Sequence, residues 1–200
     1  MALFQDPAAW LTIASLIIAL IALHQTQRQI KLSNKQQLFD RRLEKYLLLE
    51  ELLRCYREER RTIEHVRSCN TQTDEMLCIQ FISFTSTHSL GEISKCIYEK
   101  SEHNRNLFLS KLDMLDMLEQ EISFLFPQKE ANLANEFIHV YTELLITLYA
   151  YRNDIELVPI PSDDTERNWT ILTLYYALQE SCDAIENNKV ESKMAKIIHL

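Results

Sequence analysis

The chain has 200 residues, 46% of them hydrophobic, with a formal net charge of −8, one Gly and four Pro. After residue 35 there are 18 Lys and Arg against 28 Asp and Glu, so this part is acidic and a general nucleic-acid-binding surface is disfavoured. A single Gly excludes Gly-rich phosphate loops, and the scarcity of Gly and Pro favours an all-α fold of long helices.

The first predicted element is a membrane-spanning helix from Pro7 to Leu23. These 17 residues carry no charge, and at about 1.5 Å per residue they cover roughly 25 Å of a hydrocarbon core about 30 Å thick. The basic residues Arg28, Lys31 and Lys35 follow the helix, whereas only one acidic residue precedes it. The positive-inside rule then predicts a single-pass protein of a bacterial inner membrane, with its N-terminus outside and its bulk in the cytoplasm.

A cleaved signal peptide is the alternative interpretation of this segment. It would need basic residues before the apolar stretch and a small-residue cleavage site after it. No Lys or Arg precedes Pro7, and the sequence IALIALHQ offers only a weak small-residue pattern. We therefore expect an uncleaved anchor with its basic flank at residues 1–35, continuing into a cytoplasmic helical bundle at residues 36–200.

Small side chains form a stripe along the predicted span, at steps of four and three residues. The stripe consists of Ala8, Thr12, Ser15, Ala19 and Ala22. Such a face allows helix backbones to approach closely, and its two hydroxyls can add hydrogen bonds between helices. It predicts a homo-oligomer within the lipid bilayer, against the alternative that Ala is simply common in bacterial spans. Because one helix cannot enclose a pore, any channel activity requires such an oligomer.

The spacing of apolar and capping residues predicts the next helices. The span should continue as one long helix as far as Ser68. The apolar side of its second half consists of Phe39, Leu43, Tyr46, Leu49, Leu53 and Tyr56. Thr73 is a predicted N-cap for a helix through residues 76–84, and Ser89 with Glu92 forms a predicted capping box for a helix that continues through Leu118.

Two further long helices are predicted after a break at Pro127. Residues 131–157 are amphipathic and rich in aromatic side chains, which predicts a core helix. The alternative, a second membrane span, is disfavoured by the polar residues Glu136, His139 and Glu143. Residues 158–166 form a linker with two prolines, which should end one helix and cap the next. The next helix should start near Asp164, within this segment, and the chain should loosen at Asn187 and Asn188.

No set of residues has the spacing of a catalytic or metal site, so we expect a protein without enzymatic activity, cofactor or bound metal. One potential ligand set consists of Cys55, His65, Cys69 and Cys78. Its spacing matches no common zinc site. A second set consists of Asp113, Asp116 and Glu119. These carboxylates alternate with Met and Leu, which indicates a solvated helix face beside a core face.

The segment from Arg60 to His65 has the R-x4-H spacing of HEPN ribonucleases, which it resembles over six residues. Those enzymes are helical dimers in which the Arg and His act on the RNA phosphate. Arg61 stands where that family usually has a smaller polar residue. The resemblance implies a nuclease as an alternative function, while the acidic chain disfavours direct binding of nucleic acid.

The sequence QLFDRRLEKY, from Gln37 to Tyr46, resembles that of a widespread group of small bacterial inner-membrane proteins. These proteins have an N-terminal span, a basic turn, and an LFD-R-LE-Y segment that opens a helical cytoplasmic domain. The similarity continues through residues 81–100. Proteins of this build include membrane effectors of antiphage systems, among them retron-encoded ones. The resemblance implies the same topology for this chain.

Three functions remain as hypotheses. The leading one is a non-enzymatic effector of abortive infection that disrupts the inner membrane through an oligomerised span, alongside a protein partner from the same operon. The second is a passive membrane-anchored adaptor, or scaffold, that recruits a protein partner through its acidic helices. The third is a HEPN-like ribonuclease.

Overall fold

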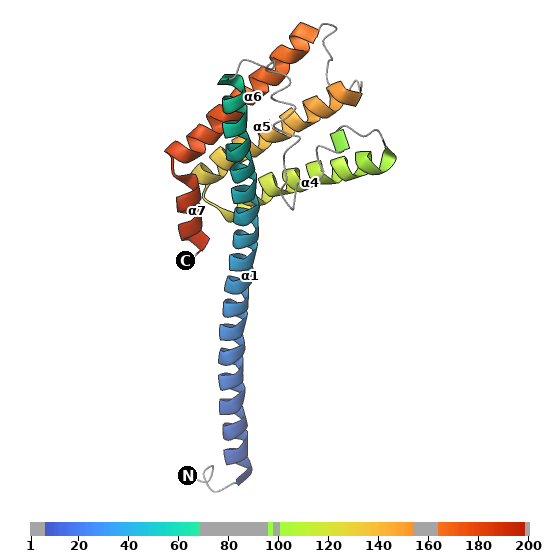
Figure 1. Cartoon of the computed structure of the whole chain (residues 1–200). Coiled ribbons are helices and arrows are strands. Elements are labelled where there is room, and N and C mark those ends of the chain that lie inside the picture. The colour runs from blue at the N-terminus through green and yellow to red at the C-terminus, as the bar shows by residue number, and fades with distance from the viewer. Residues whose placement is uncertain (1–6, 69–95, 98–100, 154–163, 199–200) are drawn as a thin grey trace. The chain divides into compact units, whose positions relative to one another are not determined.

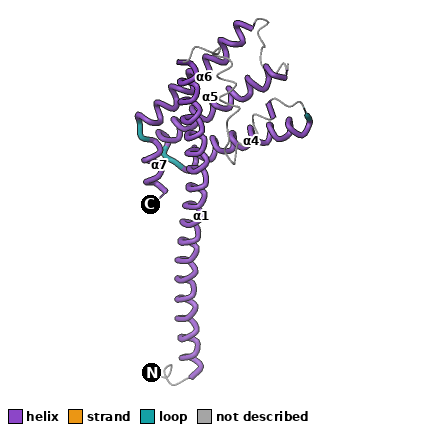
Figure 2. Tube along the Cα trace, viewed as in Figure 1, coloured by secondary structure: helices purple, strands orange, loops and turns teal. Residues whose placement is uncertain are grey.

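The computed structural model describes residues 7–68, 96–97, 101–153 and 164–198. Apart from short connections these residues are helical, and the described part contains no strand, which confirms the predicted all-α class. The helices are α1 (Pro7–Ser68), α4 (Glu102–Leu125), α5 (Gln128–Asn153), α6 (Asp164–Asn187) and α7 (Val190–Ile198) (Figure 1, Figure 2).

The chain divides into two compact units, residues 1–41 and residues 42–200. Helix α1 belongs to both, since it continues without interruption through the boundary. The predicted continuous helix as far as Ser68 is therefore confirmed, and Pro7 occupies its first turn, where a missing N–H costs nothing. In the part of the chain that the structure describes, no helix combines the length and apolarity needed to cross a membrane. The predicted boundary between a membrane anchor at residues 1–35 and a helical domain at residues 36–200 stays a prediction.

Helix α5 is the central element of the 42–200 unit and packs against α4, α6 and α7 (Figure 1). Its fully buried side chains up to Leu145 recur at steps of three and four and are Ala131, Ala134, Phe137, Ile138, Tyr141, Leu144 and Leu145; Ala150 is fully buried as well. The polar residues that disfavoured a second span, Glu136, His139 and Glu143, are exposed. The prediction of an amphipathic core helix is thus confirmed, with its polar residues on the opposite side.

The second half of α1 supplies another face of the same core. Leu49, Leu53 and Tyr56 are fully buried, as the apolar spacing predicted, and Leu52 is buried beside them. Earlier members of the predicted row are less covered, since Leu43 and Tyr46 are partly buried and Phe39 is exposed. Packing of α1 in the bundle therefore begins near the start of this unit and strengthens toward Tyr56.

A capping serine sets the start of α4. The predicted continuous helix from Ser89 through Leu118 is wrong, because Ser101 has extended backbone angles and is the N-cap of α4. Its hydroxyl accepts a hydrogen bond from the Asn104 backbone N–H at 3.1 Å, a contact that Ser makes at a helix start but not in its interior. The capping box at Ser89 and the helix at residues 76–84 lie outside the described residues.

The other predicted breaks agree with the structure. Helix α4 ends at Leu125, and Phe126 is extended because the residue before a proline is disfavoured in the helical region. Helix α6 begins at Asp164, where a helix start was predicted. Between α6 and α7, Lys189 takes a positive φ of 54°, which turns the chain sharply after Asn188.

Candidate functional site

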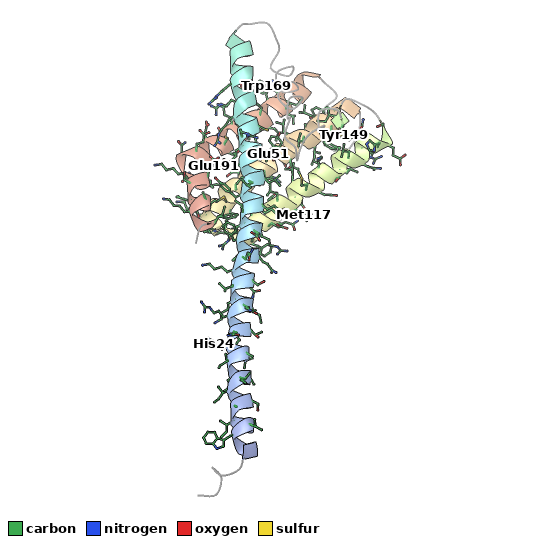
Figure 3. The ribbon with its side chains drawn as sticks, turned by 60° about the horizontal axis from the view of Figure 1, so that its bottom comes forward. His24, Glu51, Met117, Tyr149, Trp169 and Glu191 are labelled. Atoms are coloured by element: carbon green, nitrogen blue, oxygen red, sulfur yellow. The ribbon has the colours of Figure 1, made fainter. Side chains whose placement is uncertain are left out.

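The most unusual surface of the described chain is the apolar first part of α1. Nine large apolar side chains there are between 45 and 73% exposed: Trp10, Leu11, Ile13, Leu16, Ile17, Ile18, Leu20, Ile21 and Leu23. Every side chain described between Trp10 and Arg41 is exposed, including His24, which Figure 3 labels on this stretch. A continuous apolar surface of this kind marks an interaction site for a membrane or another protein.

The predicted association stripe lies within this segment. An α-helix turns by about 100° per residue, so the steps of four and three place its five members within an arc of about 80°. Ser15, Ala19 and Ala22 are exposed on α1, and the side chains of Ala8 and Thr12 are outside the described set. The predicted topology residues Arg28, Lys31 and Lys35 are also exposed, farther along the same helix. Their roles in association and topology stay predictions.

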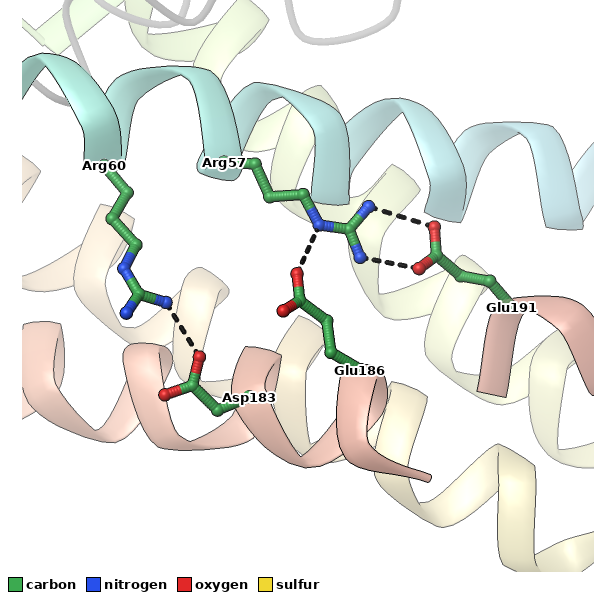
Figure 4. Close-up of polar contacts among 5 residues, drawn as sticks. All are labelled: Arg57, Arg60, Asp183, Glu186 and Glu191. Carbon is green, nitrogen blue, oxygen red and sulfur yellow. Dashed lines mark hydrogen bonds and ion pairs between the residues drawn. The ribbon is translucent and has the colours of Figure 1, made fainter. Parts of the chain in front are cut away.

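The best-defined polar cluster joins α1 to α6 and α7, and Arg57 is at its centre (Figure 4). The Arg57 Nε donates to Glu186 Oε1 at 2.7 Å. Its Nη1 and Nη2 donate to Glu191 Oε1 and Oε2 at 3.1 and 2.6 Å, which is a bidentate contact. The side chains of Arg57 and Glu191 are only 29% and 25% exposed, so solvent screens this pair incompletely.

A second arginine continues the cluster one turn later. The Arg60 Nη1 donates to Asp183 Oδ1 on α6 at 2.7 Å. Hydrogen bonding to Glu191 raises the pKa of Arg57 above its usual value, so that side chain keeps its charge over the whole accessible pH range. Together the two arginines attach α1 to the acidic residues near the end of α6 and in the first turn of α7.

These contacts bear on the resemblance to HEPN ribonucleases. Arg60, the arginine of the R-x4-H spacing, makes an ion pair with Asp183. The side chain of His65 lies outside the described residues. Within the described set the arginine therefore has a role in helix packing, and the nuclease hypothesis gains no support from its surroundings.

Replacing Arg57 with Met should lower the free energy of unfolding by about 1 to 3 kcal/mol, because the partly buried Glu191 and the exposed Glu186 lose their shared cation. The measurement is thermal unfolding of the full chain in detergent, followed by circular dichroism. Arg54→Met is the matched control, since Arg54 lies one turn earlier on α1 with an exposed side chain. Equal effects of the two substitutions would mean that the Arg57 contacts contribute no stability of their own.

The described cysteines behave as core residues. Cys55, Cys96 and Cys182 are buried free thiols, and burial raises the pKa of Cys182 to about 11. A thiol that stays protonated is a poor nucleophile and a poor metal ligand. No group of three or more His, Cys, Asp or Glu side chains is placed to hold a metal within the described ranges. The other members of the first ligand set, Cys69, Cys78 and the His65 side chain, lie outside those ranges.

The acidic set on α4 is on the surface. Asp113 and Asp116 are exposed, and the Gln120 amide donates to Asp116 Oδ2 at 2.8 Å. Leu115 and Leu118, which alternate with the carboxylates, are buried. The remaining member, Glu119, lies 3.9 Å from His139 Nδ1 on α5. Met117 is exposed as well, so the core face is narrower than the sequence indicated (Figure 3).

A shallow groove between α5 and α6 was not predicted. It has a volume of about 520 Å³ and is lined by Glu143, Ile146, Thr147, Trp169, Thr170, Thr173 and Leu174. Trp169 is 66% exposed at the start of α6 (Figure 3). Large exposed aromatic side chains are enriched where proteins bind one another, so the groove is a candidate docking surface.

Sequence reasoning missed both Arg57 and the groove. Arg57 stands in the charged run REERR, whose members are indistinguishable without their partners. The available signal for the groove was Trp169, an aromatic residue in a polar stretch near the start of α6. Comparison of the chain with protein-family models, with curated proteins and with solved structures finds no match.

Proposed function

We propose that residues 7–23 span a bacterial inner membrane once, with the bundle in the cytoplasm. The observation that carries this proposal is the row of exposed apolar side chains from Trp10 to Leu23 on one uninterrupted helix. Burying a side chain of this kind away from water stabilises a protein by about 1.5 to 3 kcal/mol. Nine of them in lipid provide ample energy for insertion, and the basic residues that follow favour the cytoplasmic side.

The function we propose is disruption of that membrane by an oligomerised span, as an effector of an antiphage system. The small side chains of Ser15, Ala19 and Ala22 are exposed on α1 and support close contact between spans. The likeness of Gln37–Tyr46 to small inner-membrane proteins supports the role in phage defence. A partner from the same operon is the proposed source of the trigger.

Helix α1 offers a physical route from trigger to membrane. Its second half is held in the bundle by buried side chains such as Leu53 and Tyr56 and by the ion pairs of Arg57. Because α1 continues without interruption into the apolar segment, a change in how the bundle holds it reaches that segment without an intervening loop. The proposed resting state is the one in which these contacts are complete.

The direct test is to induce the full chain in bacteria that carry a voltage-sensitive dye and then to apply phage infection as the trigger. Depolarisation should follow infection only in cells that make the protein. Membrane fractionation after alkaline extraction shows separately whether the chain is inserted. An unchanged potential in infected cells whose inserted protein is confirmed would contradict membrane disruption.

The second candidate function is that of a membrane-anchored adaptor, and the groove beside Trp169 favours it. Glu143 lines this groove together with apolar and hydroxyl side chains, which suits a protein segment bearing an apolar and a basic residue. The two functions differ in what they require of residues 7–23. An adaptor keeps its activity when this segment is exchanged for an unrelated span, whereas the proposed effector loses it.

A further inference from the structure

The polar stretch of α1 that follows the apolar segment has one uncharged face. Thr26, Ile30, Ser33 and Gln37 are exposed and follow steps of four, three and four. The step from Ala22 to Thr26 is also four, so these residues continue the row of the small side chains. We call these four residues the juxtamembrane face.

The charges of this stretch lie on the other side of the helix. At about 100° per residue, Arg28, Lys31 and Lys35 fall within an arc of about 60° whose centre is about 160° from the centre of the juxtamembrane face. All three are exposed. The uncharged face ends where Asp40 and Arg41 occur, immediately before the unit in which α1 packs on the bundle.

We propose that the juxtamembrane face pairs with the same face of a second copy, in parallel, as a cytoplasmic extension of the contact between spans. The inference rests on the proposed membrane function, because a shared membrane orients the two copies in the same direction. The steps of four, three and four average about 3.7 residues, close to the 3.6 residues of one helical turn, so the four side chains stay on one side of a straight helix and two parallel helices can contact each other along it.

The arrangement of charge identifies a second copy as the occupant. In a parallel pair each residue lies near its own equivalent, so a basic residue in the contact would face a like charge. The juxtamembrane face avoids this, because its Ser33 and Gln37 offer hydrogen bonds and its Ile30 offers apolar surface. A lipid surface or an acidic partner would instead be drawn to the basic side.

Cysteine cross-linking in membranes that contain the full chain tests the pairing. Ile30→Cys and Leu32→Cys form one matched pair, since the native side chains are 54% and 59% exposed and lie about 160° apart around the helix. Gln37→Cys and Phe39→Cys form a second pair with the same separation, and neither pair alters charge. The parent chain, with its own five cysteines, is the blank.

After mild oxidation, the variants at Ile30 and Gln37 should give at least tenfold more disulfide-linked dimer than those at Leu32 and Phe39. Equal yields at the four positions, larger yields at Leu32 and Phe39, or no dimer above the blank at Ile30 and Gln37 would each overturn the proposal. Introducing a charged side chain on either face of the helix gives a second test. Ile30→Lys should reduce native dimer in membranes at least fivefold, and Leu32→Lys should leave it unchanged.

Dye measurements on the same cells separate this inference from the proposed function. Cross-links at Ile30 and Gln37 without depolarisation would support the juxtamembrane face and contradict membrane disruption. Depolarisation together with cross-links that favour Leu32 and Phe39 would support disruption and overturn the juxtamembrane face.

Discussion

The double substitution Ser15→Leu and Ala19→Leu should lower the rate of depolarisation to less than a tenth of that of the parent chain. The added side chains hold neighbouring backbones apart at the stripe through which the spans are proposed to associate. They also make residues 7–23 more apolar, so insertion should be retained. Dye fluorescence after infection measures the first effect, and membrane fractionation measures the second.

The matched control for this substitution is Ala14→Leu. Ala14 is exposed in the same segment and lies about 120° around the helix from the centre of the stripe, so this control replaces one Ala with Leu on a different face. We expect this variant to depolarise the membrane like the parent chain. If the variant with Leu at Ser15 and Ala19 also does so, the stripe is incidental to disruption.

Phe137→Ala should produce the largest loss of stability, about 3 to 5 kcal/mol. Phe137 is fully buried, and its ring packs edge to face against Tyr56 of α1. The distance between ring centroids is 5.8 Å to Tyr56 and 6.1 Å to Tyr141. Its removal leaves a cavity between α1 and α5. In a chain of this length the midpoint of thermal unfolding should fall by roughly 10 °C, measured by circular dichroism in detergent.

Phe124→Ala is the control for this cavity. Phe124 is 88% exposed on α4, so the same truncation should change the free energy of unfolding by less than about 0.5 kcal/mol. A small effect at both positions would show that the core around Tyr56 and Phe137 contributes little to the measured transition.

Helix boundaries were predictable where one residue decides them locally. Pro127 and the linker before Asp164 each restrict the backbone by their own geometry, so the break and the helix start are visible in the sequence. The start of α4 was not, because Ser89 with Glu92 has the capping-box pattern, whereas Ser101 has no Glu or Gln three residues later. Only the structure shows that Ser101 is an N-cap, with its hydroxyl bonded to the Asn104 N–H.

Burial was predictable for the centre of each apolar row and less so for its edges. Leu49, Leu53 and Tyr56 follow helical spacing and are buried as expected, whereas Leu52 is buried and Phe124 is exposed without a local signal. The width of a buried face depends on how many neighbouring helices cover it. That number is a property of the assembled bundle and not of one helix.

The candidate site divides in the same way. The stripe from Ala8 to Ala22 and its continuation to Gln37 follow from sequence spacing alone, since both lie on one helix with a fixed rotation per residue. The ion pairs of Arg57 do not, because Glu186 and Glu191 come 129 and 134 residues later in the chain.

The sequence by itself therefore determined the helical class, most helix ends, the apolar first segment of α1 and the face of this helix that carries its basic residues. These properties depend on residues within a few turns of each other, whose geometry the α-helix fixes. Only the tertiary structure decided that Arg57 joins three helices, that Phe137 lies against Tyr56, and that Trp169 remains exposed beside a groove. Such contacts depend on the packing of residues far apart in the chain, which local spacing does not specify.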